Sequence, residues 1–199
     1  MPYFNKFNEP CITYGQMNLL FTIRVLWREL ATWTRAYMVN TVYGLEVAEE
    51  VFNRLYRIPE DFGNILKNFF GYDNSVKFVQ LLSQQIVLFR SLLEEMIAGD
   101  QEKTNDTIRQ LYQLANERAA LMHEINPYWD ETEVRNAINA FYQYTIDEAF
   151  AILSQDFSKD INLYDRLLHH ADTMGDHFTQ GLFQYMTLTA QNNCCRISR

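Results

Sequence analysis

The sequence predicts an all-α protein, a bundle of four to five long helices with a short helical connection. Apolar residues recur at spacings of three and four along most of the chain, and this period places them on one face of a helix. No Asn-Gly turn and no useful run of alternating apolar and polar residues is present, so nothing indicates strands or hairpins. With only 4 Pro and 7 Gly in 199 residues, a disordered or linker-rich chain is not expected.

The first long helix is expected from about Tyr14 to Tyr43, because Gly44 then favours a helix end. A helix of this length spans roughly 45 Å at 1.5 Å per residue, which predicts an elongated bundle. Its apolar face consists of residues near three- and four-residue spacing, which are Leu19, Ile23, Leu26, Leu30, Tyr37 and Val42.

Two shorter helices are predicted next, over residues 46–57 and 59–71. Pro59 suits the first position of the second one, where its missing N–H costs nothing. Gly71 is the expected end of that helix. We expect the pair to form a connection packed across the longer helices.

Three helices of bundle length follow. Gly99 is the expected stop of the first, and Pro127 prevents the second from continuing. Asp130 and Glu133 fit a capping box at the start of the third. The three helices are expected over residues 73–99, 100–126 and 130–152.

The last long helix begins near Ser158 and has the most regular pattern of the chain. Its apolar positions alternate steps of three and four, the 3.5-residue repeat of packed helices. They are Ile161, Tyr164, Leu168, Ala171, Gly175, Phe178, Leu182 and Tyr185. We therefore expect one helical-bundle domain over residues 14–188, an N-terminal extension over 1–13 and a flexible C-terminal tail over 189–199.

The chain is acidic, with 17 Lys and Arg against 25 Asp and Glu and a formal net charge of −8. Nucleic-acid binding needs a basic patch that neutralises phosphates, and an anionic membrane surface would repel this protein. No apolar run approaches the roughly 20 residues of a membrane span. We expect neither nucleic acid nor membrane as a partner.

The cysteines do not form a disulfide framework. Cys11, Cys194 and Cys195 are an odd number without spaced pairs. Two reduced thiols near the C-terminus fit a reducing compartment, so the cytoplasm is the expected location.

Catalytic motifs are absent from the sequence. It has no Gly-rich phosphate loop, no nucleophile elbow and no Glu-x-x-His pair of the kind that binds metal in helical bundles. No catalytic residue is predicted, and no cofactor either. The favoured hypothesis is a non-enzymatic protein that acts in protein interaction or structure, as a homodimer or with a protein partner.

A divalent-metal site is the first alternative. Four polar residues of the last helix fall within about 60° of one another at 100° per residue. Together with Glu29, they are the candidate metal ligands, since His and carboxylates bind divalent cations: Asp165, His169, Asp172 and Asp176. The same residues also fit a solvated flank of an acidic protein.

A small-ligand pocket is the second alternative. Glu29 and Arg35 flank an aromatic stretch of the first helix that includes Trp33, and these three residues are the candidate ligand-binding set. A buried Glu29 would need a cation or hydrogen-bond donors. The candidates for that cation are Arg28, Arg35, Arg57 and Arg118, and the competing interpretation is a structural ion pair or an exposed charge.

Several stretches resemble one family of sequences. They are Leu26-Trp27-Arg28-Glu29, Trp33-Thr34-Arg35, Leu55-Tyr56-Arg57-Ile58-Pro59, Phe69-Phe70-Gly71, Ile125-Asn126-Pro127-Tyr128-Trp129, Tyr164-Asp165 and Met174-Gly175-Asp176. Over residues 20 to 180 the chain is similar to a family of small helical bacterial proteins from Clostridia and Bacilli, whose function is uncharacterised.

The resemblance implies a helical fold and raises the question of a metal centre. Members of that family have His directly after the Trp-Arg-Glu stretch and in the third and fifth helices. Here the matching positions hold Leu30, Gln85 and Phe141, so the metal ligands that the resemblance implies are missing. Some members have a kinase-type name for acetylglutamate, but that activity requires an α/β nucleotide site, which this sequence does not predict.

Overall fold

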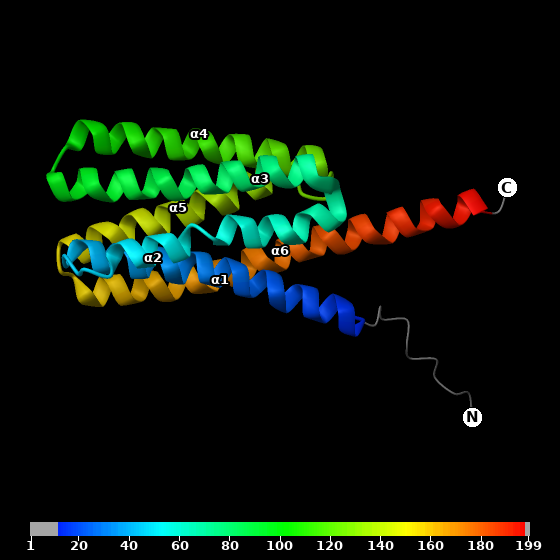
Figure 1. Cartoon of the computed structure of the whole chain (residues 1–199), viewed down its shortest axis with the longest axis horizontal. Coiled ribbons are helices and arrows are strands. Elements are labelled where there is room, and N and C mark those ends of the chain that lie inside the picture. The colour runs from blue at the N-terminus through cyan, green and yellow to red at the C-terminus, as the bar shows by residue number, and fades with distance from the viewer. Residues whose placement is uncertain (1–11, 198–199) are drawn as a thin grey trace, which may run out of the picture.

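The computed structural model describes residues 12–197, with side chains up to residue 187. Its helices are α1 (Tyr14–Val42), α2 (Ala48–Leu55), α3 (Ile58–Ala98), α4 (Gln101–Ile125), α5 (Glu131–Leu153) and α6 (Phe157–Ile197) (Figure 1). Residues 12–197 contain no strand. The predicted all-α multi-helix bundle is confirmed. Within the same residues, no helix is both long and apolar enough to cross a membrane.

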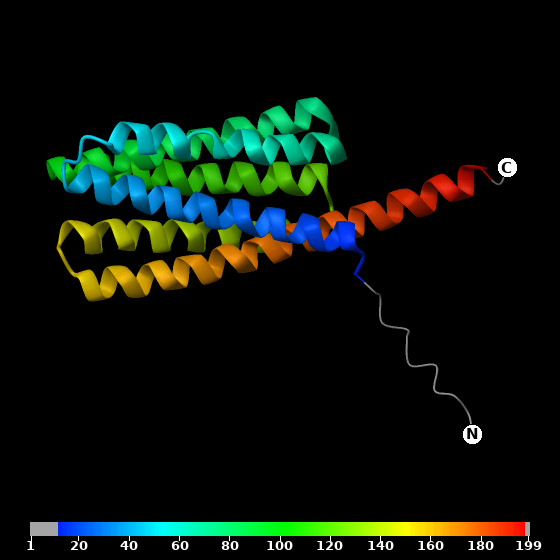
Figure 2. The same cartoon turned by 60° about the horizontal axis from the view of Figure 1, so that its bottom comes forward.

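The helices lie side by side along one long axis (Figures 1 and 2). Helix α1 contacts α2, α3, α5 and α6, while α4 contacts α3 and α5. The first helix is therefore central to the bundle. Because α6 continues to Ile197, it projects beyond the ends of the neighbouring helices.

Helix α3 is a hairpin of two arms that meet at Gly71. This glycine has φ 81° and ψ 174°, a left-handed backbone conformation that side chains disfavour. The arms run antiparallel, since the Ser75 hydroxyl donates to the Gly63 carbonyl over 2.8 Å and the rings of Phe62 and Phe78 lie 5.8 Å apart. The predicted helix end at Gly71 is confirmed.

The expected packing of the short helices was wrong. Helix α2 and the first arm of α3 follow one another along α1 instead of crossing it (Figures 1 and 2). Leu55, Ile58, Phe62 and Leu66 are all buried in the common core, so the two pieces together bury one continuous apolar face lengthwise. Helix α2 and the first arm of α3 thus together take the place of one long helix in the bundle, interrupted between Leu55 and Ile58.

The helix boundaries follow the sequence signals closely. Asp130 accepts the Glu133 backbone N–H over 2.9 Å and caps α5. Only this half of the predicted capping box forms, because the Glu133 carboxylate lies 4.0 Å from His177 instead of bonding the Asp130 backbone. Gly99 has φ 71° and ends α3. The expected domain end at residue 188 is not a helix end, since α6 runs to Ile197.

Three expectations lie wholly or in part outside the described residues, and the backbone of the expected tail is α-helical as far as Ile197. Cys11 and residues 1–11 are not described, and neither are the side chains of Cys194 and Cys195. The N-terminal extension, the flexible tail and the reduced state of the thiols therefore stay predictions.

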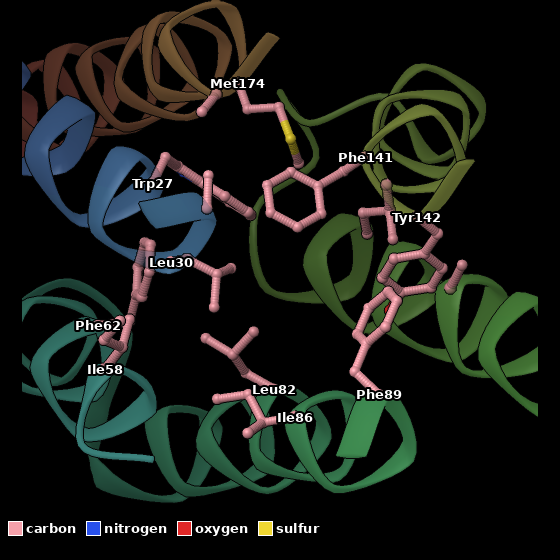
Figure 3. Packing of buried hydrophobic residues seen from close by; sticks show 14 of the residues in the cluster. Trp27, Leu30, Ile58, Phe62, Leu82, Ile86, Phe89, Phe141, Tyr142 and Met174 are labelled. Atoms are coloured by element: carbon pink, nitrogen blue, oxygen red, sulfur yellow. The ribbon is translucent and has the colours of Figure 1, made fainter. Parts of the chain in front are cut away.

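Aromatic rings fill the centre of the bundle. The Trp27 ring meets Phe62 at 5.1 Å and both Phe141 and Phe178 at 6.3 Å, all edge to face. Figure 3 shows Trp27, Phe141 and Met174 converging from α1, α5 and α6. Such contacts add about 0.5–1.5 kcal/mol each beyond the area that they bury.

The Asn-Pro-Tyr-Trp stretch between α4 and α5 holds α6 in place. Trp129 is fully buried, and its Nε1 donates to the Phe178 carbonyl over 3.0 Å. The indole lies so close to Gly181 that a Cβ there would overlap its nitrogen. The Asn126 side chain is also buried and accepts the Tyr128 backbone N–H over 3.2 Å, which shapes the turn. This motif therefore has a packing role.

Replacing Gly181 by Ala should destabilise the fold by about 2 kcal/mol or more, because the new methyl group meets the packed Trp129 ring. Urea denaturation measures this directly. Gly15→Ala is the matched control, since no atom lies within 4 Å of a Cβ at Gly15 and Ala favours helix by up to about 1 kcal/mol. Equal stability of the two variants would contradict the close packing of α6 on Trp129.

Candidate functional site

Two of the candidate metal ligands on α6 bind arginines of α1. The Arg24 guanidinium donates to both carboxylate oxygens of Asp176, with Nη2 to Oδ2 at 2.6 Å. Arg28 Nη1 lies 2.7 Å from Asp172 Oδ2. These half-exposed pairs join the two helices, and surface pairs of this kind contribute about 0–1 kcal/mol each.

The other two candidates on α6, Asp165 and His169, are exposed. They border a shallow depression together with Tyr144 and His170. His170 turns inward, where its Nε2 lies 2.8 Å from the Ala137 carbonyl oxygen, and burial lowers the pKa of this imidazole. Over the described part of the chain, no three His, Cys, Asp or Glu side chains come together as a group that could hold a metal ion.

Glu29 forms a structural ion pair with a residue that sequence reasoning did not consider. Its Oε2 lies 2.9 Å from Arg54 Nη2 of α2, and the Arg54 guanidinium covers the Trp33 ring at 5.0 Å. Arg54 is the cation, in place of Arg28, Arg35, Arg57 or Arg118. Glu29 and Trp33 thus share one partner, whereas Arg35 binds α5 and α6, so the three do not line a common pocket.

Arg35 is the centre of a buried charge cluster that we call the α1–α5–α6 cluster. It comprises Arg35, Glu148 and Asp160. The Arg35 Nη1 donates to Glu148 and to Asp160, and its Nη2 donates to Asp160 Oδ2 over 2.9 Å. The Glu148 side chain is 0% exposed, and the Arg35 guanidinium stacks on Tyr164 at 4.7 Å.

Burial controls the protonation of this cluster. Loss of solvent raises the pKa of Glu148 to about 7, against the lowering effect of Arg35, and the charge of Asp160 adds to the rise. The hydrogen bond to Asp160 is the main cause that raises the pKa of Arg35. Glu148 Oε2 has no hydrogen-bond donor among the described residues. The Arg35 guanidinium therefore donates hydrogen bonds to two carboxyl groups. It binds both oxygens of Asp160 but only one oxygen of Glu148.

Glu148 should make the stability of the protein fall as the pH rises from about 4.5 to about 7. In this interval the folded state keeps the Glu148 proton that the unfolded state releases, so raising the pH favours unfolding. Glu148→Gln cannot ionise and should gain about 3 kcal/mol relative to the unchanged protein across this window.

Urea denaturation between these pH values tests the effect. Glu117→Gln serves as the control, because this side chain is exposed on α4. A difference between the Glu148→Gln variant and the unchanged protein that stays constant with pH would refute this account of the cluster.

A second polar cluster lies wholly inside the bundle, between α3, α4 and α5. Arg118 is 1% exposed, and its Nη1 donates to Gln85 Oε1 and to Tyr142 Oη. The guanidinium lies 5.7 Å from the Phe78 ring. Its Nε and Nη2 have no hydrogen-bond acceptor among the described residues. The cluster joins three helices, with Gln85 from α3, Arg118 from α4 and Tyr142 from α5.

Neither Arg118 nor Glu148 was predicted as a core residue, although the sequence contains a signal for both. Gln85 and Arg118 each occupy a position in the apolar repeat of a predicted helix, and a polar residue in such a position indicates a buried polar contact. Glu148 also continues the apolar repeat of its predicted helix, since it lies three residues after Thr145 and four before Ile152. All three residues are buried in α5.

An exposed apolar face remains on the first half of α1. We call it the α1 stripe and define it as Tyr14, Met17, Phe21 and Val25. Tyr14 is 76% exposed, and Phe21 and Val25 are each 52% exposed. At 100° per residue, the four side chains fall within about 80° of one another, so they form one continuous strip.

Comparisons of the chain with known protein families, with curated proteins and with solved structures found no match. The resemblance to the bacterial helical family stays a prediction.

Proposed function

We propose that this protein is a non-enzymatic helical bundle that binds another protein through the α1 stripe. The observation that carries the proposal is the unbroken apolar strip on a helix whose other face is fixed in the core by Trp27 and Leu30. Single exposed apolar residues are ordinary, whereas a contiguous apolar strip is characteristic of interaction sites. Spacings of three and four are those of a helix that docks on another helix.

The pairing of the charged residues favours an interaction protein over the two alternatives. Glu29, Asp172 and Asp176, as candidate metal ligands, each bind an arginine. Arg35, as a candidate ligand-binding residue, binds two carboxyl groups. These side chains stabilise helix contacts, so we assign them a structural role and place the function on the exposed apolar surface.

Cysteine labelling in the native host cells tests whether the stripe is covered. Val25→Cys, in a background with Cys11, Cys194 and Cys195 changed to Ser, should react with a maleimide about tenfold more slowly in cells than as dilute purified protein. The reason is that a site docked nine-tenths of the time leaves a tenth of the molecules free to react.

Ile161→Cys is the matched control, because Ile161 is an apolar residue of α6 with 57% exposure. It should react at the same rate in both settings. Equal rates for Val25→Cys in cells and in dilute solution would refute the proposed function.

A further inference from the structure

We infer that the partner of the α1 stripe is a second copy of this chain, with the two α1 helices packed antiparallel about a two-fold axis near Leu19 and Leu20. This inference rests on the proposed function, because it names the occupant of the same surface. It is supported by the charge distribution, by the self-complementary spacing of the stripe and by the length of α6.

The charges of the chain favour contact between two copies at this surface. No Asp or Glu occurs in residues 10–28 or 177–199, so all 25 acidic residues lie elsewhere. Two copies of a protein with net charge −8 repel each other over most of their surface. They meet with least repulsion where the carboxylates are missing, and that region contains the α1 stripe.

The spacing of the stripe matches itself in the antiparallel direction. With the axis near Leu19 and Leu20, Tyr14 faces Val25 of the second copy, and Met17 faces Phe21 of the second copy. The large Tyr14 ring thus meets the smaller Val25 side chain, and the Met17 thioether meets the Phe21 ring. A contact between a thioether and a ring stabilises by about 0.3–1.5 kcal/mol. A symmetric dimer uses one patch on both subunits and therefore requires such a match.

Arg24 and Arg28 do not oppose this arrangement. In the same register Arg24 lies opposite Gly15 of the second copy, and Arg28 lies still farther from the axis, so neither faces its own symmetry mate. Arg24 is also neutralised by Asp176, and Arg28 by Asp172. The rim of the interface therefore brings no two like charges face to face.

The projecting part of α6 extends the surface beyond α1. The pairs Arg24–Asp176 and Arg28–Asp172 set an antiparallel register, in which Tyr14 lies level with Met186, another exposed apolar residue. The α6 backbone continues to Ile197, roughly ten residues or 15 Å farther. A stable interface needs about 800 Å² on each partner, more than four side chains of one helix supply, and the exposed Met186 beside Tyr14 adds to the α1 stripe.

Two charged variants test both the occupant and the direction of packing. Tyr14→Lys/Met17→Lys and Phe21→Glu/Val25→Glu should each weaken self-association by about 100-fold or more, because charges then face apolar groups. When the two variants are mixed, each Lys faces a Glu of the other variant, and the remaining stripe residues keep their native contacts. Sedimentation velocity should therefore show dimers in the unchanged protein and in the mixture, and monomers in each variant alone.

The control is Phe157→Glu/Ile161→Glu, which charges two similarly exposed apolar residues at the other end of the bundle. It should leave the dimer intact, and a helical spectrum shows that each monomeric variant is folded. Failure of the mixture to recover dimers would overturn the antiparallel arrangement, since parallel helices would place each Lys opposite an apolar residue.

The result for the unchanged protein separates this inference from the proposed function. A monomer at about 100 µM, a concentration that detects even weak dimers, would overturn the second copy as the occupant. Protection of Val25→Cys in cells would then still support docking by a different protein. If the unchanged protein is a monomer and Val25→Cys is not protected in cells, the proposed function is overturned as well.

Discussion

The antiparallel contact between α1 and α6 is the constraint on which the rest of the bundle depends. At its centre Gly175 has no side chain, and a Cβ there would lie 2.9 Å from the Arg24 Cα, so the two backbones approach closely. Farther along, Arg35 joins α1 to Asp160 of α6 and to Glu148 of α5. Because α1 also contacts α2 and α3, its position on α6 sets the position of every helix except α4.

The buried polar groups explain how the protein keeps a single helix arrangement. An apolar core alone tolerates sliding of one helix along another, whereas a buried guanidinium must keep its acceptors or lose several kcal/mol. Arg118, which is buried, and Arg35, which is partly buried and binds the buried Glu148, provide such fixed points at two levels of the bundle. Their partners come from α3, α5 and α6, so both clusters specify which helices are neighbours.

Most of the fold could be predicted from the sequence, because helix periods and caps are local signals. Gly71 and Gly99 marked their helix ends correctly. The apolar repeat identified the core of α6 from Ala171 to Leu182, but it was wrong at the start of that helix, where Ile161 is 57% exposed and Leu163 and Leu167 are buried instead. The site could not be predicted equally well, since ion pairs depend on which helices become neighbours. Glu29 had several arginines within reach along the chain, yet its partner is Arg54, which α2 brings alongside α1. The lengthwise packing of α2 was missed for the same reason.

The central claim is that α1 uses one face to fix the bundle and its other face to bind a second copy. A nitroxide spin label at Thr22, an exposed residue beside the α1 stripe, tests this claim most directly. In the antiparallel dimer the two labels lie within about 25 Å of each other, because packed helices are 8–10 Å apart and Thr22 lies close to the axis. Pulsed electron paramagnetic resonance should therefore show a distance between the two labels of at most about 25 Å. A sample with no coupling between labels, or only distances far beyond about 40 Å, would contradict it.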